Sequence, residues 1–512
     1  MPEADYFKNK KVLVFGLGLL GGGVATTNWL LKHGAKVTVT DLKNKKQLAS
    51  SLRRIKGPFG GLRASKVKLK LGGHSEKDIK ENEIIVLNPD VSPENRLIKL
   101  ARKLGKQIEN EATIFYKLCS KPIVAVTGTR GKTTTANWLA HFLNARYKTV
   151  ISGNSYIEPL LKTLDRVNKF SVVVNELPSY HLELFDGGIK APEVVITNIF
   201  QDHLNRHGSL KNYVRAKANI FKNQTANQNL VLNHDNKWTP FILKLKPNAK
   251  TWFFSLSSLP KRLAGVFYKN EAVYPAPFAG KRCGIYFQNG GKAKKVLGIR
   301  GFADKWGEHN LQNLLAASLM AHICGVPWAK IRQRIKTLPQ IPFRQEVVFQ
   351  NRKIRIINDT SATSPDGGIA AIKRFALPSV ALLCPSEAFG EGGAKERPSC
   401  ILIAGGTDRQ LDFREWGRVV RKLIKPENII LLSGSATDKM LKHLGLSLNK
   451  IQVFDTLEKC VKTGLAKARK LGNATLLFSP AAKSFEKFKN EFDRGKQFNA
   501  LIRKEVKKWI KR

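Results

Sequence analysis

Residues 122–135 read PIVAVTGTRGKTTT, and this stretch is the most informative about the fold. Its apolar start predicts a buried strand, the glycine-containing segment predicts a tight loop, and the residues that follow predict a helix. Backbone N–H groups of such a loop can surround a phosphate, Lys132 can reach the terminal phosphates of a nucleotide, and the Thr133 hydroxyl can bind Mg²⁺. The usual first glycine of this pattern falls at Val126, so the loop is a shorter form of it. We expect ATP to bind here, at Gly128, Thr129, Arg130, Gly131, Lys132, Thr133 and Thr134.

Strand-like apolar runs recur along most of the chain and alternate with helix-like stretches. They begin at residues 11 (KVLVF), 36 (KVTVT), 83 (EIIVLN), 171 (SVVVNEL), 193 (EVVITNI), 400 (CILIAGG) and 474 (ATLLFSP). This alternation is typical of α/β proteins with parallel sheets. Several runs end in Gly, Asn, Asp or Glu, at the strand ends where open α/β sheets bind their ligands. We therefore expect an α/β fold whose functional residues follow its strands.

The length of 512 residues indicates about three domains, at roughly 100 to 200 residues each. One boundary is expected near residues 120–122, just before the strand that leads into the glycine loop, and another near residues 339–342, which begin and end with proline. The expected domains are residues 1–120, 121–341 and 342–512. Residues 244–300 carry no motif, and their role stays open.

A second glycine motif, GLGLLG at residues 16–21, follows the run at 11–15, and Asp41 ends the next run, 20 residues beyond Gly21. This is the full dinucleotide-binding fingerprint, in which glycines let the backbone approach a diphosphate at a helix N-terminus and the carboxylate binds hydroxyls. NAD, FAD and a UDP-sugar all carry a diphosphate, so the motif leaves the nucleotide open, and a plain tight turn is the alternative without function. Two phosphate sites on separate sheets argue against a simple dehydrogenase and suggest ATP acting on a nucleotide-linked substrate.

Two polar residues that follow strand-like runs are candidates for a metal site. Glu176 follows the run from 171, and His203 follows the run from 193. A carboxylate and an imidazole at neighbouring strand ends could share Mg²⁺, which accepts few protein ligands and keeps phosphate oxygens. Taken singly, a histidine is more often a packing or surface residue. Lys217 stands in no distinguishing local pattern.

Charge is the unusual feature of the composition. Lys and Arg number 88 against 39 Asp and Glu, which leaves a net charge of +49 and indicates anionic partners. The basic residues are spread along the chain without a nucleic-acid-binding motif, so we expect phosphate ligands and no stable nucleic-acid partner. A basic nucleic-acid-binding protein with a phosphate loop stays as the alternative from another class.

We expect a cytoplasmic monomer without a membrane span. The six cysteines are dispersed and form no C-x-x-C pair, which fits a reducing compartment. Residues 12–31 are uncharged and long enough to cross a bilayer. Five glycines, two threonines and an asparagine interrupt them, which favours a strand, a turn and a helix instead.

Nine segments taken together resemble the Mur ligases. They are, in chain order, GLGLLGG, VTGTRGKTTT, ELPSYHLE, TNIFQDHLNRHG, YVRAKANIF, GEHNLQN, IPFRQE, NDTSATSPD and LLFSPAAKSFEKFKN. They extend over nearly the whole chain, which makes the combination far more specific than any one motif. The resemblance implies an N-terminal Rossmann-like domain for a UDP-sugar, a central phosphate-loop ATPase domain with a parallel sheet, and a Rossmann-like C-terminal domain that brings the amino acid and closes over the site.

The resemblance also implies a reaction. ATP would phosphorylate the alanyl carboxylate of UDP-N-acetylmuramoyl-L-alanine to an acyl phosphate, and the amine of D-glutamate would then displace the phosphate, in peptidoglycan precursor synthesis. ATP and Mg²⁺ would be the cofactors. Thr133 and Glu176 would bind a first Mg²⁺ and His203 a second, and Lys217 matches the lysine that is carbamylated in this family near the metal cluster. Lys132, Glu176, His203 and Lys217 would carry the catalysis.

Further residue roles follow from the same resemblance. Asn310 and Asn313 would face the adenine, Asp359 the ribose and Arg344 the phosphates. The UDP-sugar pocket would be lined by Gly18, Leu19, Asp41 and Asn154. D-Glutamate would be surrounded by Thr363, Arg409, Ser484 and Phe485.

Several positions depart from the family pattern and leave the amino-acid specificity open. Pro178 in ELPSYHLE replaces a hydroxyl that could touch the sugar, and Ser361 and Arg409 stand where many members carry lysine. Arg409 can still bind a carboxylate, even bidentately. A Mur-type ligase for a different amino acid is therefore an alternative. An NAD-dependent oxidoreductase is disfavoured because it would leave the second glycine loop, Glu176 and His203 without a role.

Overall fold

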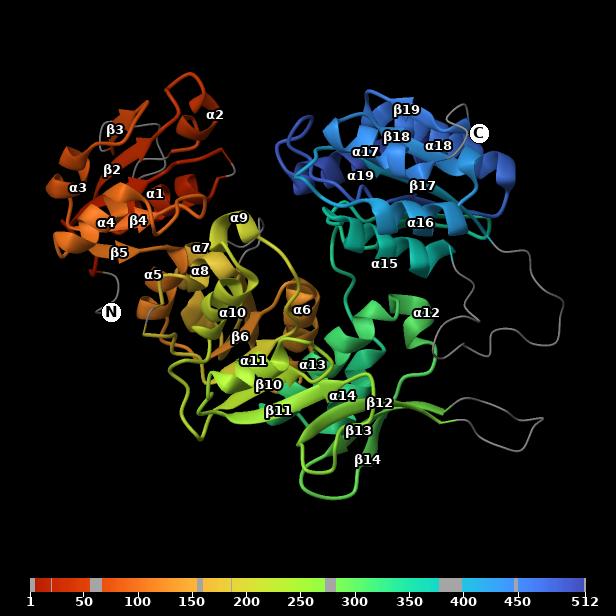
Figure 1. Ribbon diagram of the computed structural model, residues 1–512, viewed down its shortest axis with the longest axis horizontal. Helices are drawn as coiled ribbons and strands as arrows, with labels where there is room; N and C mark the ends of the chain where they lie inside the picture. Colours follow the sequence, from red (N-terminus) through yellow and green to blue (C-terminus); the bar gives the residue numbers. More distant parts are fainter. Residues whose placement is uncertain are drawn as a thin grey trace. The chain divides into compact units, whose positions relative to one another are not determined.

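The computed structural model describes residues 5–19, 21–55, 67–153, 160–185, 187–271, 282–376, 398–445 and 450–510. They form an α/β structure with three sheets (Figure 1). By compactness the chain divides into two units. The first unit comprises Met1–Lys269, Ile285–Leu297 and Gln312–Leu338, and the second comprises Asn270–Gly284, Gly298–Leu311 and Pro339–Arg512. The domain boundaries expected near residues 120 and 341 stay a prediction.

The first sheet has five strands in the order β3-β2-β1-β4-β5, and all of its pairs are parallel. β1 lies in the middle because the chain adds β2 and β3 on one side and then β4 and β5 on the other. Open α/β sheets bind ligands where the strand order reverses in this way. The strands are β1 (Lys11–Phe15), β2 (Lys36–Asp41), β3 (Val67–Leu71), β4 (Ile84–Leu87) and β5 (Gln107–Glu109). The helices are α1 (Gly22–Lys32), α2 (Ala49–Leu52), α3 (Glu76–Glu81), α4 (Arg96–Lys103) and α5 (Glu111–Leu118).

The second sheet has nine strands in the order β14-β13-β12-β11-β10-β9-β6-β8-β7. They are β6 (Ile123–Thr127), β7 (Thr149–Gly153), β8 (Val172–Glu176), β9 (Glu193–Ile196), β10 (Asn229–Asn233), β11 (Lys250–Ser255), β12 (Gly265–Glu271), β13 (Arg282–Gln288) and β14 (Lys294–Gly298). The helical elements are α6 (Lys132–Leu143), α7 (Leu160–Leu164), η2 (Val167–Lys169), α8 (Ser179–Leu182), α9 (Leu204–His207), α10 (Leu210–Ala218), α11 (Thr239–Lys244), α12 (Phe302–Trp306), α13 (His309–Ile323) and α14 (Trp328–Ile335). Residues 244–300, which carry no sequence motif, contribute β11 to β14 to one side of this sheet.

The third sheet has the order β15-β16-β20-β17-β18-β19, with β15 antiparallel to β16 and the other pairs parallel. Its strands are β15 (Glu346–Gln350), β16 (Ile354–Asn358), β17 (Ser399–Gly405), β18 (Ile429–Leu432), β19 (Gln452–Phe454) and β20 (Ala474–Phe478). Its helical elements are α15 (Pro365–Ala376), α16 (Arg414–Leu423), η4 (Pro426–Asn428), α17 (Ser435–Leu444), α18 (Leu457–Leu471) and α19 (Glu491–Ile510).

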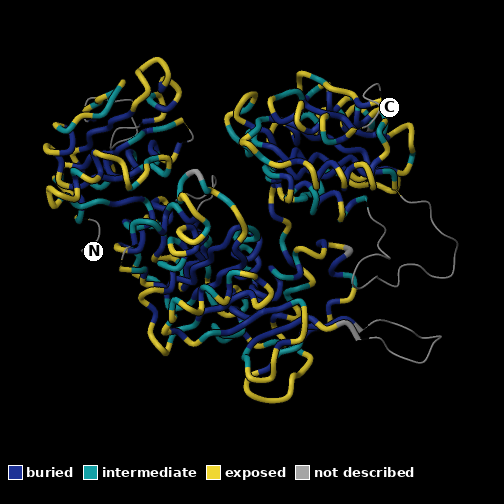
Figure 2. The backbone as a smooth tube through the Cα atoms, in the orientation of Figure 1, coloured by how far each residue is buried: buried dark blue, intermediate teal, exposed yellow. Residues whose placement is uncertain are grey.

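All eight quoted apolar runs form strands, which confirms the α/β class. β6 and β8 are buried at every position, because a parallel strand with helices on both faces has no solvent side (Figure 2). The uncharged run 12–31 forms β1 and α1 as expected. Within the described ranges no helix is long and apolar enough to cross a membrane. Cys324, Cys400 and Cys460 carry free thiols, whereas Cys283 is disulfide-bonded.

Candidate active site

The glycine loop after β6 has a backbone that only glycine can supply at two positions. Gly128 has φ +147° and Gly131, the N-cap of α6, has φ +80°. A Cβ on Gly128 would lie 1.9 Å from the hydroxyl of Thr197, and a Cβ on Gly131 would lie 2.1 Å from Oδ1 of Asn313. The loop is therefore packed directly against neighbouring side chains. The start of α6 lies at this loop, so the backbone N–H groups of the first turn are available to a phosphate.

Asn198, which follows β9, holds the glycine loop by several hydrogen bonds. Its carbonyl and its Oδ1 accept from the amides of Thr129 and Arg130, both at 2.8 Å. Its Nδ2 donates to the carbonyl of Arg130 at 3.1 Å, and the Thr197 hydroxyl donates to the same carbonyl at 2.7 Å. The sequence reasoning missed both residues, although they directly follow a strand-like run.

Two lysines lie against the carbonyls of this loop. Lys132 Nζ donates to the carbonyl of Thr129 at 3.1 Å. Lys217 Nζ, on α10, donates to the carbonyl of Gly128 at 3.0 Å and to the hydroxyl of Thr127 at 3.3 Å, and the side chain is 1% exposed. Burial lowers the pKa of Lys217 well below its ordinary value, and the charge of Lys132 adds to this. Burial thus makes the neutral amine of Lys217 easier to reach than that of an exposed lysine.

The two candidate metal ligands end or follow the strands that flank β6 on either side. Glu176 ends β8, which pairs with β6 at Val126, and it is 6% exposed. His203 follows β9 and is the N-cap of α9, with φ +52°. The parallel pairing of β6 with both β8 and β9 brings these ends to the edge that carries the glycine loop.

Asp202 connects this edge to the loop. Its Oδ2 accepts from the Arg130 guanidinium at 2.9 Å, and its Oδ1 accepts from the amide of His203 at 3.0 Å. Burial opposes ionisation of Asp202, but the charges of His203 and Arg130 outweigh it and lower the pKa of the carboxyl. No three His, Cys, Asp or Glu residues gather into a metal cage in the part of the chain that the structure describes. A hydroxyl and a carboxylate still suit Mg²⁺, which takes oxygen ligands and commonly relies on substrate phosphates.

Two side chains of the protein itself, Asp41 and Asn88, contact the N-terminal glycine loop. Asp41 Oδ2 accepts from the amides of Leu17 and Gly18, both at 2.9 Å. A Cβ on Gly16 would lie 3.0 Å from Cβ of Asn88, and a Cβ on Gly18 would lie 3.3 Å from Nδ2 of Asn88. The glycines therefore admit Asn88, and the fingerprint carboxylate binds the loop amides that the motif would offer to a diphosphate. The sequence motif correctly predicted a tight loop between a strand and a helix, but it did not show that Asp41 and Asn88 contact this loop.

Of the other residues expected to line the UDP-sugar pocket, one is exposed beside this loop and one lies outside the described residues. Leu19 is 47% exposed beside this loop. Arg54, which the sequence reasoning did not consider, has its guanidinium 2.6 Å from the position of a Cβ on Gly21 at the start of α1. Asn154 lies outside the described residues.

In the second unit, Asp359 follows β16 and is held by internal hydrogen bonds. Its Oδ2 accepts from the Ser479 hydroxyl at 2.8 Å and its Oδ1 from the amide of Gln345 at 3.0 Å. Burial raises the pKa of Asp359 to about 7. Arg344 precedes Gln345 and contributes an opposing charge that favours the carboxylate. The structure therefore brings Asp359 and Arg344 together, as expected of two residues that would share one nucleotide.

The residues expected around the amino acid lie on two paired loops. Thr407 and Lys483 exchange backbone hydrogen bonds at 2.8 and 3.1 Å, which joins the loop after β17 to the loop after β20. The guanidinium of Arg409 lies 5.1 Å from the ring centroid of Phe485. Ser484 is 2% exposed, and its buried hydroxyl has no hydrogen-bond partner within the described ranges. Thr363 lies in the turn before α15, and its amide donates to the carbonyl of Ser361.

The two expected adenine-binding residues are placed differently. Asn313 lies against the phosphate loop, where its Oδ1 accepts from the Thr135 hydroxyl at 3.2 Å and where Gly131 leaves room for it. Asn310 donates from Nδ2 to the carbonyl of Trp306 at 2.7 Å. Thr133 and Thr134 lie in the first turn of α6.

Known proteins resemble this chain over nearly its whole length. The family model of the Mur ligase middle domain matches residues 126–321, and that of the N-terminal domain of MurD-like Mur ligases matches residues 10–110. The UDP-N-acetylmuramoylalanine–D-glutamate ligase of Roseiflexus sp. (strain RS-1) is 34% identical, with 96% of this chain and 98% of the relative covered. The ligase of the same name from Borreliella afzelii (strain PKo) is 33% identical, with 97% and 98% covered.

A solved structure supports the fold. The MurF ligase of Thermotoga maritima, determined in complex with ADP, has a TM-score of 0.54 at 16% identity, with 98% of this chain and 99% of that chain covered. With full-length relatives above 30% identity and two domain models in the expected order, the chain belongs to the Mur ligase family.

Proposed function

We propose that the chain is an ATP-dependent acid–amino-acid ligase that joins D-glutamate to UDP-N-acetylmuramoyl-L-alanine in peptidoglycan precursor synthesis. The relatives that are 34% and 33% identical carry this activity in their names. The structural observation that carries the proposal is the phosphate loop, whose glycines admit no side chain and whose carbonyls bind the amines of Lys132 and Lys217.

The ATP phosphates would lie along the loop from Gly128 to Thr133, with Lys132 beside the terminal phosphate. An oxygen of the alanyl carboxylate attacks the terminal phosphorus, and ADP leaves. The amine nitrogen of D-glutamate then attacks the acyl carbon and loses a proton, and phosphate leaves as the amide forms. The chain contributes position and charge, since neither step needs a covalent bond to the protein.

Mg²⁺, when bound, neutralises charge on the transferred phosphoryl group. Thr133 and Glu176 would hold one ion, and His203 would hold a second. The neutral amine that burial favours at Lys217 is the form that can react with CO₂, so carbamylation of Lys217 is part of this proposal. A carbamate would convert a buried amine into an oxygen donor beside the loop.

The remaining expected residues would bind the amino acid, the nucleotide and the UDP-sugar. Arg409 would pair with a carboxylate of D-glutamate, because a guanidinium binds a carboxylate bidentately. Ser484, whose buried hydroxyl has no hydrogen-bond partner among the described residues, would surround the same amino acid together with Phe485 and Thr363. Arg344 and Asp359 would bind the phosphates and the ribose of ATP, and Asn310 and Asn313 the adenine. Gly18, Leu19, Asp41 and Asn154 would line the UDP-sugar pocket.

We place this activity in the cytoplasm, where ATP is available, and in a monomer. The free thiols of Cys324, Cys400 and Cys460 fit a reducing compartment, and the disulfide at Cys283 is the exception.

The test is phosphate release from ATP by the purified protein with UDP-N-acetylmuramoyl-L-alanine. We expect release with D-glutamate and none with L-glutamate or without an amino acid, and we expect a dipeptidyl product by mass spectrometry. Lys132→Ala should abolish release. Release with another amino acid would assign a different Mur-type specificity. No release with any amino acid, together with nucleic-acid binding that weakens steeply with salt, would favour the nucleic-acid alternative instead.

A further inference from the structure

Two loops that would hold the amino-acid substrate are connected through the first residue of α17, a helix that follows β18 of the third sheet (Figure 1). The loop after β17 (residues 406–413) carries Arg409, and the loop after β20 (residues 479–490) carries Ser484 and Phe485. The sequence reasoning predicted these three residues but none of those that connect the two loops. Both loops and α17 belong to the second unit.

Ser435, the first residue of α17, makes the connection. Its hydroxyl accepts from the amide of Asp408 at 2.9 Å, in the loop after β17, and donates to Oε1 of Glu486, in the loop after β20. The amide of Ser435 donates to Oε2 of Glu486 at 3.0 Å. One serine therefore binds the residue before Arg409 and the residue after Phe485.

The carboxylate of Glu486 caps α17 from outside the helix. The N-cap residue, Gly434, has no side chain that could accept from the first amides of the helix. A Cβ on Gly434 would lie 2.8 Å from Oε2 of Glu486 and 2.6 Å from the carbonyl oxygen of Gly406. Glycine thus leaves the space that the carboxylate occupies, and the positive end of the helix dipole favours a carboxylate there.

Further contacts hold the same two loops together. The amide of Glu486 donates to the Thr407 hydroxyl at 3.0 Å, next to the backbone pair between Thr407 and Lys483. Nζ of Lys439, also on α17, lies 2.5 Å from Oδ2 of Asp408. The start of α17 therefore binds the acidic side chains of both loops.

The residues expected to bind the amino acid keep their own binding groups for a ligand. Asp408 and Glu486 are bound by α17, and neither pairs with the guanidinium of Arg409, which lies 5.1 Å from the ring centroid of Phe485. The buried hydroxyl of Ser484 has no hydrogen-bond partner among the residues that the structure describes. A cation on one loop and a hydroxyl on the other suit a ligand with two acceptor groups, such as a dicarboxylic amino acid.

A ligand with two carboxylates is bound at both ends only when the two loops keep a fixed separation. We propose that Ser435 and Glu486 are positioning residues for the amino-acid substrate, because they tie both loops to α17 and so fix Arg409 relative to Ser484. This inference rests on the proposed function and adds to it two residues that determine the affinity for the amino acid without touching it.

The test measures the KM of each substrate separately in the phosphate-release assay. Ser435→Ala removes the bridging hydroxyl and keeps the backbone. It should raise the KM for D-glutamate roughly three- to tenfold, the value of one hydrogen bond, and leave the KM for ATP and for UDP-N-acetylmuramoyl-L-alanine unchanged. Ser435→Thr keeps the hydroxyl and should restore the wild-type KM. Glu486→Gln should act like Ser435→Ala, and the double variant should be no worse than the more impaired single variant, because the two residues form one contact.

Asp438→Asn is the matched control. Asp438 is an exposed acidic residue in the first turn of the same helix, and its replacement makes the same change of charge without a contact to either loop. It should leave all three KM values unchanged. The thermal midpoint of each variant shows whether it has folded.

Three outcomes would overturn the inference: no rise in the KM for the amino acid, an equal rise in the KM for all three substrates, or a Ser435→Thr variant as impaired as Ser435→Ala. If another amino acid supported release by the wild-type protein, the same comparison would be made with that amino acid. If none did, the proposed function would fail together with the inference, whereas an unselective effect in an active protein overturns only the inference.

Discussion

Arg206 of α9 forms an ion pair with Glu183 at the end of α8 and also binds the segment after β4, and replacing Arg206 by Gln tests how much the first unit depends on these contacts. Nη2 of Arg206 lies 2.7 Å from Oε2 of Glu183, with only 17% and 12% of the two side chains exposed. The guanidinium also binds the carbonyls of Pro89 and Val91 in the segment after β4. Arg206→Gln therefore leaves a buried carboxylate without its cation and frees that segment from α9.

The expected cost follows from the burial of this pair. Removing one member of a buried pair costs about 3–5 kcal/mol, because the other charge stays desolvated and uncompensated. We expect the lower end, about 3 kcal/mol, because His207 Nδ1 lies 3.4 Å from Oε1 of Glu183 and can take over part of the pairing. For a cooperative unit of about 300 residues, this corresponds to a fall of roughly 5 °C in the thermal midpoint.

His207 makes the loss of stability caused by Arg206→Gln depend on pH. Burial lowers the pKa of His207, Glu183 raises it, and the charge of Arg206 lowers it further. Without Arg206, the folded state binds a proton at His207 more readily than in the wild-type protein. A raised pKa in the folded state stabilises at low pH and loses its effect as pH rises. The deficit of Arg206→Gln should therefore be smaller at ~pH 5.5 than at ~pH 8, on either side of the ordinary histidine pKa.

The assay is thermal unfolding of both proteins at the two pH values, with Arg215→Gln as control. Arg215 lies on the exposed face of α10 and makes only a 3.4 Å contact with Asn212, so its loss should cost less than about 0.5 kcal/mol. If Arg206→Gln shifted the midpoint no more than Arg215→Gln does, the pair would not stabilise the unit. A deficit that grew toward low pH would refute the role given to His207.

Three further predictions concern the loops and the buried titratable groups. Gly128→Ala should abolish ATP turnover, because its Cβ would lie 1.9 Å from the Thr197 hydroxyl at φ +147°, whereas Gly291→Ala, with no atom within 4 Å of its Cβ and no positive φ, should keep turnover in the same phosphate-release assay. Lys217→Arg should lose ATP turnover while ADP still binds, because a guanidinium cannot adopt the neutral form that burial favours at this position; turnover near the wild-type level would contradict this. Asp359→Asn should flatten the pH dependence of the thermal midpoint of the second unit. Burial raises the pKa of Asp359 to about 7, so the wild-type unit loses stability as pH rises from the ordinary aspartate pKa through that value, and an unaltered pH profile would exclude Asp359 as its cause.

The sequence predicted those parts of the fold that local pattern determines. Eight apolar runs became strands, because a run of β-branched and aliphatic residues between turn residues is buried from both sides in a parallel sheet. Glu176 and His203 were predicted for the same reason, since parallel strands bring their carboxyl ends to one edge. The order of the strands β14 to β10 could not be predicted, because no local signal states which strands pair.

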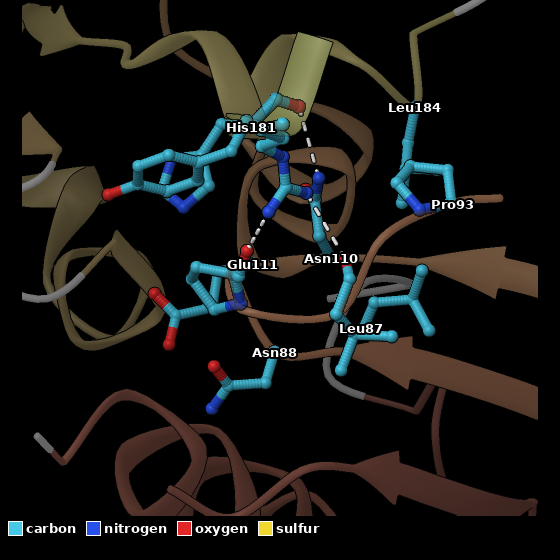
Figure 3. A pocket seen from close by; sticks show the side chains of 11 residues that line it. Leu87, Asn88, Pro93, Asn110, Glu111, His181 and Leu184 are labelled. Atoms are coloured by element: carbon cyan, nitrogen blue, oxygen red, sulfur yellow. Dashed lines mark hydrogen bonds between the residues drawn. The ribbon is translucent and has the colours of Figure 1, made fainter. Parts of the chain in front are cut away.

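Contacts between residues that are far apart in the sequence could not be predicted from local sequence patterns. Arg206 and Glu183 are separated by 23 residues, and Arg206 and Pro89 by 117, so no local spacing links them. His181 is an ordinary helix residue in the sequence, and only the structure shows that its Nδ1 is buried without a hydrogen-bond partner among the described residues (Figure 3). The signal that could have pointed to Arg206 is its place three residues after His203 in a segment that follows a strand.

The two glycine loops make clear what a glycine motif does and does not specify. In both loops a positive φ and a close neighbour oppose a side chain, at Gly128 and Gly131 in one loop and at Gly16 in the other. A glycine motif therefore indicates that some group lies close to the backbone without identifying that group. In the N-terminal loop the close groups are the side chains of Asn88 and Asp41. What separates the loops is charge. Lys132 and Lys217 lie at the carbonyls of the loop after β6, whereas a carboxylate lies at the amides of the loop after β1, where it would repel a diphosphate. An anion that binds near α1 must then either displace Asp41 or lie toward Arg54 at Gly21. The charges, more than the glycine spacing, therefore favour the loop after β6 as the site that we propose for the phosphates of ATP.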